Sequence, residues 1–162
     1  MESSVTLRPA TPEDQEFLFA LYASTREEEM SLWGWDDTQK QMFLELQFRA
    51  KFQQYSLSYP QADDDVVLLN GQPVGRMMVD RQGPEFTFLD IALLPEYRNR
   101  KIGTTLIQQM EQDATNAQKS VVLHVVRTNV AARLYERLGF TPVKEDDVYR
   151  EMRFTQAKTT AI

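Results

Sequence analysis

The hydrophobic residues of this chain fall into blocks that switch between the two-residue period of strands and the 3.6-residue period of helices. Val5 to Arg8 alternates apolar and polar residues like a strand. Thr11-Pro12-Glu13-Asp14 supplies an N-cap, a first-turn proline and acidic side chains, so a helix is predicted from Pro12 to about Ser24. Trp33-Gly34-Trp35-Asp36 interrupts the pattern. A second helix is then predicted to end before Tyr59-Pro60, and its apolar positions are Met42, Phe43, Leu46, Phe48 and Phe52.

The clearest turn signal is Asn70-Gly71, which lies between the apolar run 66–69 and the run from Val74 to Asp80. Asn-Gly favours the two positive φ values of a type I′ turn, so an antiparallel hairpin is predicted here. A third apolar run, from Phe86 to Leu94, predicts another strand that stops at Pro95.

The second half of the chain continues to alternate helix and strand patterns. Apolar residues recur at helical spacing from Ile102 to Met110, and Ser120 to Val126 is rich in β-branched residues, as in a strand. Val130 to Leu138 is predicted as a helix closed by Gly139, because a left-handed residue commonly follows the end of a helix. Val148 to Phe154 is predicted as the final strand.

The expected order is therefore β-α-α-β-β-β-α-β-α-β, with one more short strand near Val143, which predicts an α/β (α+β) fold: a mixed sheet with helices on its faces. The chain shows no internal repeat and no low-complexity linker. Only the last residues, Thr155 to Ile162, are typical of a tail.

The composition argues against nucleic-acid binding, cysteine chemistry and metal binding. A chain of 162 residues fits one domain, and 18 Lys and Arg against 24 Asp and Glu give a net charge of −6, so no nucleic-acid partner is expected. There is no cysteine and one histidine, which excludes disulfides, thiolate zinc sites and cysteine nucleophiles and makes a metal site improbable. With no signal-peptide pattern and no apolar run long enough for a membrane span, we expect a cytoplasmic protein with no membrane partner.

The most informative segment is a basic turn after the apolar strand that ends at Leu94. Arg98, Arg100 and Lys101 lie within four residues and are followed at once by the predicted helix start. Unpaired N–H groups at a helix N-terminus, together with these cations, favour an anion. The alternative is a solvated basic loop. Neither a Walker A sequence nor Gly-x-Gly-x-x-Gly is present, so neither a P-loop nor a dinucleotide site is indicated.

Two motifs together make the chain resemble the GNAT superfamily of acyl-CoA-dependent N-acetyltransferases. The turn from Arg98 to Gly103 is similar to the pyrophosphate-binding motif of that family, Arg/Gln-x-x-Gly-x-Gly/Ala, and Leu134-Tyr135-Glu136-Arg137-Leu138-Gly139-Phe140 is similar to its C-terminal helix signature. Lys101 stands where the first glycine is usual. We expect an ordinary helical position there, with the ammonium group near a phosphate.

The resemblance extends over residues 4–154, because it includes Arg8-Pro9-Ala10, Asn70-Gly71 and Pro73-Val74-Gly75. It implies one GNAT-like domain with a mixed, mostly antiparallel sheet of six to seven strands flanked by four helices. It also implies acetyl-CoA as co-substrate and no metal, and it is compatible with a homodimer, because dimers are common in that family.

The family pattern also implies where acetyl-CoA binds. It would lie between the strand ending at Leu94 and the strand from Ser120 to Val126. Its pantetheine would pair with backbone groups of Ile91, Ala92 and Leu93 and hydrogen-bond Asn129. Its phosphates would lie on the turn formed by Arg98, Asn99, Arg100, Lys101, Ile102, Gly103 and Thr104.

Catalytic candidates follow from the same resemblance. Tyr135 matches the tyrosine that serves as general acid, since a phenol is still protonated at neutral pH. Its alternative role is to pack its ring on the sheet. His124 and Asp90 are the candidate bases. His124 is the only histidine and its alternative is a hydrogen-bonded core residue; Asp90 is expected to share a face with Phe88 and Ala92, and its alternative is a structural salt bridge.

Acceptor recognition is expected from the first two helices and their connection, Thr25 to Asp37. Glu27-Glu28-Glu29 and Asp36-Asp37 flank Trp33 and Trp35, a mixture suited to a cationic amine. The favoured alternative is an exposed acidic helix end beside two core tryptophans.

The function implied is transfer of an acetyl group from acetyl-CoA to a primary amine of a small molecule or peptide, by direct attack in a ternary complex. Two alternatives are open at this point. One is a non-catalytic acyl-CoA-binding module on the same scaffold. The other is an interaction protein in which the two motifs serve packing alone.

Overall fold

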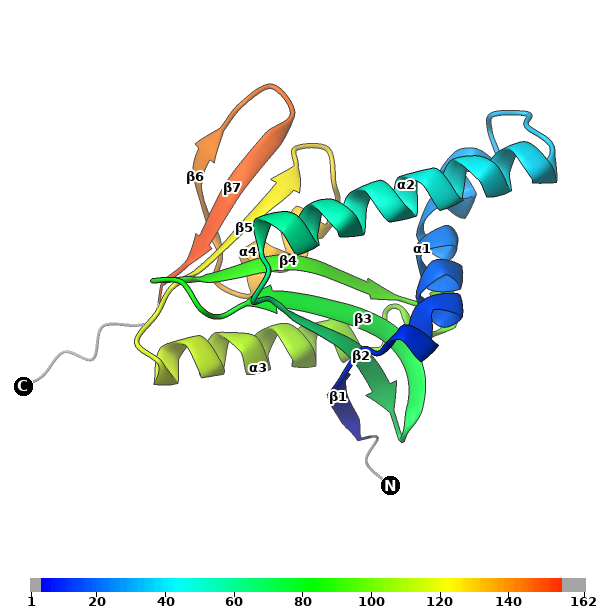
Figure 1. Cartoon of the computed structure of the whole chain (residues 1–162). Coiled ribbons are helices and arrows are strands. Elements are labelled where there is room, and N and C mark those ends of the chain that lie inside the picture. The colour runs from blue at the N-terminus through cyan, green and yellow to red at the C-terminus, as the bar shows by residue number, and fades with distance from the viewer. Residues whose placement is uncertain (1–3, 156–162) are drawn as a thin grey trace, which may run out of the picture.

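The computed structural model describes residues 4–155 and shows a seven-stranded sheet with helices on both faces (Figure 1). The strands are β1 Val5–Pro9, β2 Asp63–Leu69, β3 Gln72–Asp80, β4 Phe86–Leu93, β5 Val121–Val126, β6 Thr141–Glu145 and β7 Tyr149–Phe154. The helices are α1 Gln15–Met30, α2 Asp37–Ser58, α3 Ile102–Asn116 and α4 Ala131–Arg137, with short 3-10 turns η1 Pro12–Asp14 and η2 Pro95–Tyr97. The predicted order of elements is confirmed, including the short strand at Val143. The predicted tail lies almost wholly outside the described residues.

The strand order across the sheet is β1-β2-β3-β4-β5-β7-β6, and neighbouring strands are antiparallel except for the central pair, β4 and β5. That parallel pair is short. Its register runs from Phe86–Val121 to Phe88–Leu123 and ends there, although both strands continue. Beyond this point the two strands separate, and the β5-facing edge of β4 has no strand partner within residues 4–155.

A β-bulge in β4 decides which way its side chains point. Met78 pairs with Asp90 and Val79 pairs with Phe88, so Leu89 is an extra residue that interrupts the alternation. Phe88 faces the core beneath α3 and α4, whereas Asp90 faces α2, where it contacts Lys51. The expectation that Asp90 shares a face with Phe88 is therefore wrong, because strict alternation does not allow for the extra residue.

The main core lies between the sheet and the helices α3 and α4. Helix α3 presents one apolar face to it because its hydrophobic residues recur three and four positions apart. The fully buried members from α3 are Ile102, Leu106, Ile107, Met110 and Ala114. A smaller apolar cluster, which includes Tyr22, Met30 and Leu44, joins α1 to α2 on the other side of the sheet. No helix among the described residues is both long enough and apolar enough to cross a membrane.

Helix α1 continues six residues beyond the predicted end at Ser24. Residues 26–29 are charged helix formers, and Arg26 donates two hydrogen bonds to Glu29 one turn later. Met30, 2% exposed, then anchors the last turn against α2. The apolar pattern does not predict this polar part of the helix, because residues 26–29 contain no apolar side chain.

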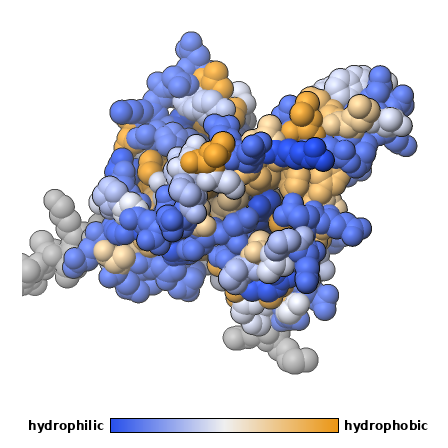
Figure 2. All heavy atoms as spheres, in the orientation of Figure 1, coloured by the Kyte–Doolittle hydropathy of each residue, from blue (hydrophilic) through white to orange (hydrophobic). Residues whose placement is uncertain are grey.

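The connection between α1 and α2 lies at the far end of an arm that extends beyond the sheet (Figure 1). Trp33 and Trp35 are 36% and 37% exposed and pack on each other and on Phe43, with ring centroids 5.1–5.5 Å apart. They are not core residues, contrary to expectation. Figure 2 shows hydrophobic and hydrophilic residues mixed along this arm.

Two predicted turns have the expected backbone. Asn70 and Gly71 have φ values of 51° and 83°, as a type I′ hairpin requires. Gly139 follows α4 with φ 99°, in the left-handed region predicted for it.

One buried acid makes stability depend on pH. Glu111 on α3 is 8% exposed, its Oε2 has no hydrogen-bond partner, and burial raises its pKa to about 7 from 4.5. Because its pKa is raised on folding, the protonated Glu111 carboxyl stabilises the folded protein relative to the ionised form. That stabilisation is complete below about pH 4.5 and is lost as pH rises through about 7.

We expect Glu111→Gln to raise the free energy of unfolding by about 1 kcal/mol at pH 8 and by almost nothing at pH 4. Urea unfolding at both pH values measures this. Glu27→Gln, on the exposed surface, is the control, and an equal gain at pH 4 and pH 8 would contradict the assignment.

Candidate active site

The basic turn before α3 has an unusual backbone. Lys101 is the N-cap residue of α3, with φ 64° and ψ 12°, and Asn99 also has a positive φ of 60°. The expectation of an ordinary helical position at Lys101 is wrong. The chain must turn sharply through the left-handed region to begin the helix, which glycine does without a Cβ penalty and lysine does not.

The basic side chains of this turn are arranged between two hollows. Arg98 Nε donates to the Leu93 carbonyl, 3.0 Å away, and the Arg100 guanidinium lies over the Tyr97 ring at 5.5 Å. Arg98 and Gly103 line a cavity of about 290 Å³ that continues along β4. Arg100 and Lys101 line a second cavity of about 520 Å³ against the β2–β3 hairpin. An anion on the turn would therefore meet charge from both sides.

The first of these cavities runs along the unpaired edge of β4. Ile91, Ala92 and Leu93 line it together with Thr25, Ile107 and Leu134. A strand edge without a partner leaves backbone N–H and C=O groups free to pair with an extended ligand. We call this cavity the β4 groove.

Tyr135 lies on α4, at the point where β4 and β5 separate. Its ring contacts Phe88 and Phe140 edge-on, with centroids 5.9 Å from each. Burial, and secondarily the charge of Asp90, raises the pKa of the Tyr135 phenol to about 12. The hydroxyl is therefore protonated at every pH at which the protein would be assayed.

Asn129 precedes α4, and its side-chain amide oxygen already accepts a hydrogen bond. Its Oδ1 accepts a hydrogen bond from the Ala131 N–H at 2.9 Å, which satisfies a donor at the start of the helix. Its Nδ2 has no partner within residues 4–155. The amide nitrogen is therefore free to donate to a ligand.

His124 is on the surface of a cleft and not in the core. Its side chain is 53% exposed, and its Nε2 lies 3.1 Å from Oε1 of Glu151 on the neighbouring strand β7. With Tyr55, Thr87 and Tyr149, it lines a cleft of about 610 Å³ between α2 and the central strands. The core alternative for His124 is wrong, because its position on β5 faces away from α3 and α4.

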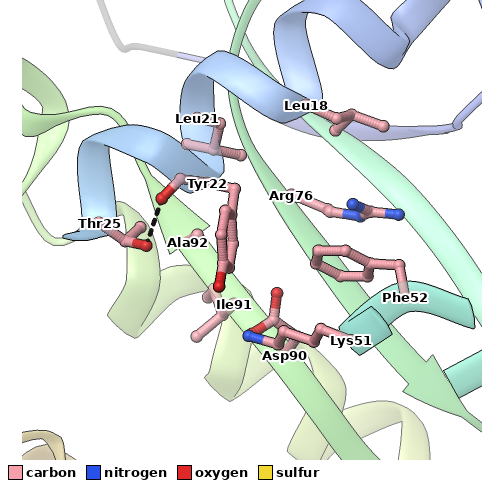
Figure 3. A pocket seen from close by; sticks show the side chains of 10 residues that line it. All are labelled: Leu18, Leu21, Tyr22, Thr25, Lys51, Phe52, Arg76, Asp90, Ile91 and Ala92. Carbon is pink, nitrogen blue, oxygen red and sulfur yellow. Dashed lines mark hydrogen bonds and ion pairs between the residues drawn. The ribbon is translucent and has the colours of Figure 1, made fainter. Parts of the chain in front are cut away.

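Asp90 forms a salt bridge, as its alternative role predicted, but with a partner that the sequence did not indicate. Its Oδ1 lies 3.2 Å from Lys51 Nζ on α2, and its side chain is 16% exposed. Asp90, Lys51, Tyr22 and Arg76 line a small cavity of about 150 Å³ beneath α2 (Figure 3), which we call the Arg76 pocket. The only sequence signal for Arg76 was a charge inside the apolar run Val74 to Val79.

The acidic connection between α1 and α2 contributes little to these cavities. Asp36 accepts a hydrogen bond from the Gln39 N–H and caps α2, and Glu29 pairs with Arg26. Of the segment 25–37, only Thr25 lines the cavities described above.

The three hollows around β4 adjoin one another. The Arg76 pocket shares Thr25, Ile91 and Ala92 with the β4 groove, and it shares Tyr22 and Lys51 with the larger cleft. A ligand in the groove and a second molecule from the cleft would therefore meet beside Asp90. Of the site residues predicted from sequence, those that line these three hollows are His124, Asp90, Ile91, Ala92, Leu93, Arg98 and Gly103. Arg100, Lys101 and Ile102 line the cavity at the β2–β3 hairpin, and Tyr135 and Asn129 line none of these cavities.

Comparisons with known proteins agree with this geometry. A model described as the Acetyltransferase (GNAT) family matches residues 19–140. The PaiA N-acetyltransferase of Thermoplasma acidophilum, solved in complex with coenzyme A, has a TM-score of 0.70 at 20% identity over 94% of this chain and 99% of that one. An acetyltransferase of Thermus thermophilus has a TM-score of 0.67 at 16% identity over 93% of this chain and 96% of that one. At these identities the likeness is one of fold. No curated protein sequence matches the chain.

Proposed function

The chain belongs to the GNAT acetyltransferase family, and from that membership we propose that it is an N-acetyltransferase. The acetyl group passes from acetyl-CoA to a primary amine of a small molecule or peptide, with both substrates bound at once. The observation that carries the proposal is the separation of β4 from β5 beyond Phe88, next to the basic turn that begins α3. An open strand edge beside an anion-binding helix start suits a long thioester substrate with phosphates at one end.

The residues that would hold acetyl-CoA are the ones around the β4 groove. Backbone groups of Ile91, Ala92 and Leu93 pair with its pantetheine, Asn129 Nδ2 donates to it, and the turn from Arg98 to Thr104 binds its phosphates. Acetyl-CoA, when bound, supplies an acetyl thioester and a thiolate leaving group.

The chain itself supplies charge stabilisation and a proton. A free N–H on the edge of β4, among residues 91–93, stabilises negative charge on the thioester oxygen. The amine nitrogen bonds to the acetyl carbon, the carbon–sulfur bond breaks, and Tyr135 gives its proton to the sulfur. The phenol of Tyr135 has a pKa of about 12 and is therefore protonated before each turnover, as a proton donor must be.

The base that takes the amine proton is His124 or Asp90. His124 is exposed in the larger cleft, from which the amine would enter. Asp90 lies between the cleft and the groove, where it is paired with Lys51. The variants His124→Gln and Asp90→Asn distinguish the two candidate bases. We expect kcat/KM to rise with pH on the acidic side of its profile, and only the variant that lacks the base should lose that rise.

Lys101 offers a prediction about the turn itself. Lys101→Ala removes the ammonium group but keeps the Cβ, whereas Lys101→Gly removes both. We expect the Gly variant to be more stable than the Ala variant by about 1 kcal/mol, because only glycine tolerates φ 64° freely. Both variants should bind CoA about twofold to tenfold more weakly than the parent, since both lose one charge near the phosphates. Thermal unfolding and calorimetric CoA titration measure the two effects. Equal stability of the two variants would refute a strained turn.

The proposed function is tested by measuring thiol release from acetyl-CoA over a panel of primary amines, together with calorimetric binding of CoA. We expect CoA binding and amine-dependent thiol release. Tight CoA binding with no turnover on any amine would favour the non-catalytic binding module. Absence of any CoA-dependent thermal shift would favour an interaction protein.

A further inference from the structure

The Arg76 pocket contains a buried cation with unused hydrogen-bond donors. Arg76 on β3 is 4% exposed. Its Nε and Nη2 donate to the two carboxylate oxygens of Asp64 at 2.8 and 2.7 Å, and its guanidinium lies 3.8 Å from the centre of the Phe52 ring. These contacts fix the guanidinium in place. Its Nη1 is buried and has no hydrogen-bond partner, a state that native proteins avoid unless a ligand or water completes it.

A second cation in the same pocket also has spare donors. Lys51 Nζ makes one hydrogen bond, to Asp90 Oδ1 at 3.2 Å, and an ammonium group has three N–H donors. The faces of the Tyr22 and Phe52 rings lie 5.7 and 5.4 Å from Nζ and hold it by cation–π attraction. Figure 3 shows Lys51 and Asp90 meeting tip to tip below Arg76 and Phe52.

Tyr22 adds a further donor to this wall. Its hydroxyl oxygen accepts a hydrogen bond from Arg26 Nη1 at 3.0 Å, so its own hydrogen must point elsewhere. Arg76, Lys51 and Tyr22 therefore each have an N–H or O–H without a partner among residues 4–155, and Asp90 Oδ2 accepts no hydrogen bond from those residues. A ligand that complements these donors carries negatively charged oxygens and, near Asp90, a cationic or N–H group.

We propose that the Arg76 pocket binds a carboxylate group of the acetyl acceptor, while Asp90 holds its amine. This inference rests on the proposed function and names the substrate class: a small molecule that carries both an amine and a carboxylate, like an amino acid. A volume of about 150 Å³ has room for roughly five water-sized groups, so it suits a small acceptor.

The position of the pocket agrees with that assignment. Ile91 and Ala92 line both the pocket and the β4 groove. An amine held at Asp90 is therefore next to the strand edge on which the thioester would lie. A doubly charged phosphate fits less well, since each cation already has a carboxylate partner, Asp90 for Lys51 and Asp64 for Arg76.

The experiment compares acceptors that differ only in the carboxylate. Glycine, alanine, β-alanine and 4-aminobutyrate are assayed by thiol release at saturating acetyl-CoA, each beside its carboxamide. We expect kcat/KM for at least one acid to exceed that of its carboxamide by tenfold or more. Equal rates on every acid and its carboxamide would overturn the inference and leave the proposed function standing.

Variants test whether the pocket is the cause of the preference. Lys51→Met keeps the aliphatic stem of a half-buried residue, and Arg76→Lys keeps a charge beside Asp64 but removes Nη1. Each should reduce the acid-to-carboxamide ratio at least fivefold. Arg49→Lys, on the exposed side of α2, should keep the parental ratio. An unchanged ratio in Lys51→Met, with a melting temperature that shows the variant to be folded, would overturn the assignment.

A binding measurement separates the two proposals. If no amine is acetylated, the proposed function fails, and thermal shift of the CoA-saturated protein with the same acids and carboxamides then decides the inference alone. Stabilisation by an acid but not by its carboxamide supports the carboxylate subsite, and no difference overturns it. If inorganic phosphate competes with the amino acids for the pocket more strongly than acetate does, the pocket is a phosphate site and the inference is overturned.

Discussion

Replacement of Tyr135 by phenylalanine is expected to lower turnover by one or more orders of magnitude with little change in CoA affinity. The phenol is the proton donor proposed for the departing thiolate, and phenylalanine keeps the ring that packs on Phe88 and Phe140. General acid catalysis commonly contributes about 10²-fold to 10⁴-fold, so the loss should be readily measured. Steady-state thiol release gives kcat, and calorimetry gives the CoA dissociation constant.

A matched variant separates loss of the proton donor from loss of any phenol. Tyr97→Phe removes a hydroxyl from a tyrosine that, like Tyr135, is half-buried against the main core but has no proposed part in the proton transfer, and it should retain turnover. Parental turnover in Tyr135→Phe would remove Tyr135 from its proposed role. A pH profile adds a second check. Since the Tyr135 pKa is about 12, the parental rate should show no basic limb from this residue below about pH 10.

Local patterns predicted those parts of the fold that local chemistry decides. The Asn70-Gly71 turn, the left-handed Gly139 and the apolar face of α3 depend on residues close together in sequence, and the structure has all three. The cavities also gather the two family-like motifs, although these are about thirty residues apart in the chain.

Features that depend on contacts between distant residues were not predictable from pattern. The bulge at Leu89 changes which face Asp90 occupies, and only the pairing with β3 reveals it. The partners Lys51 and Asp90 are 39 residues apart, and no local signal joins them. The residue pattern allows a helical position at Lys101, whereas Lys101 precedes α3 as its N-cap and has a left-handed backbone.

The largest structural effect is expected from Gly75→Ala, in the middle of β3. A Cβ atom at Gly75 would lie 2.3 Å from the carbonyl oxygen of Ala92 and 2.7 Å from Leu93 Cδ2. The first of these is a backbone atom, so β3 and β4 must move apart at the residues that line the β4 groove. We expect about 2–3 kcal/mol of destabilisation, seen as a fall in melting temperature of about 5–10 °C.

The same displacement should weaken CoA binding, because it moves the strand edge proposed to pair with the pantetheine. The control is Gly83→Ala, where a Cβ would meet only the Glu85 carbonyl oxygen at an ordinary 3.6 Å, and its melting temperature and CoA affinity should stay close to parental values. The two losses should occur together, since one shift of β4 causes both. If Gly75→Ala lost stability but bound CoA with parental affinity, the edge of β4 could not be the pantetheine site, and acetyl-CoA would have to be sought on another face of the sheet.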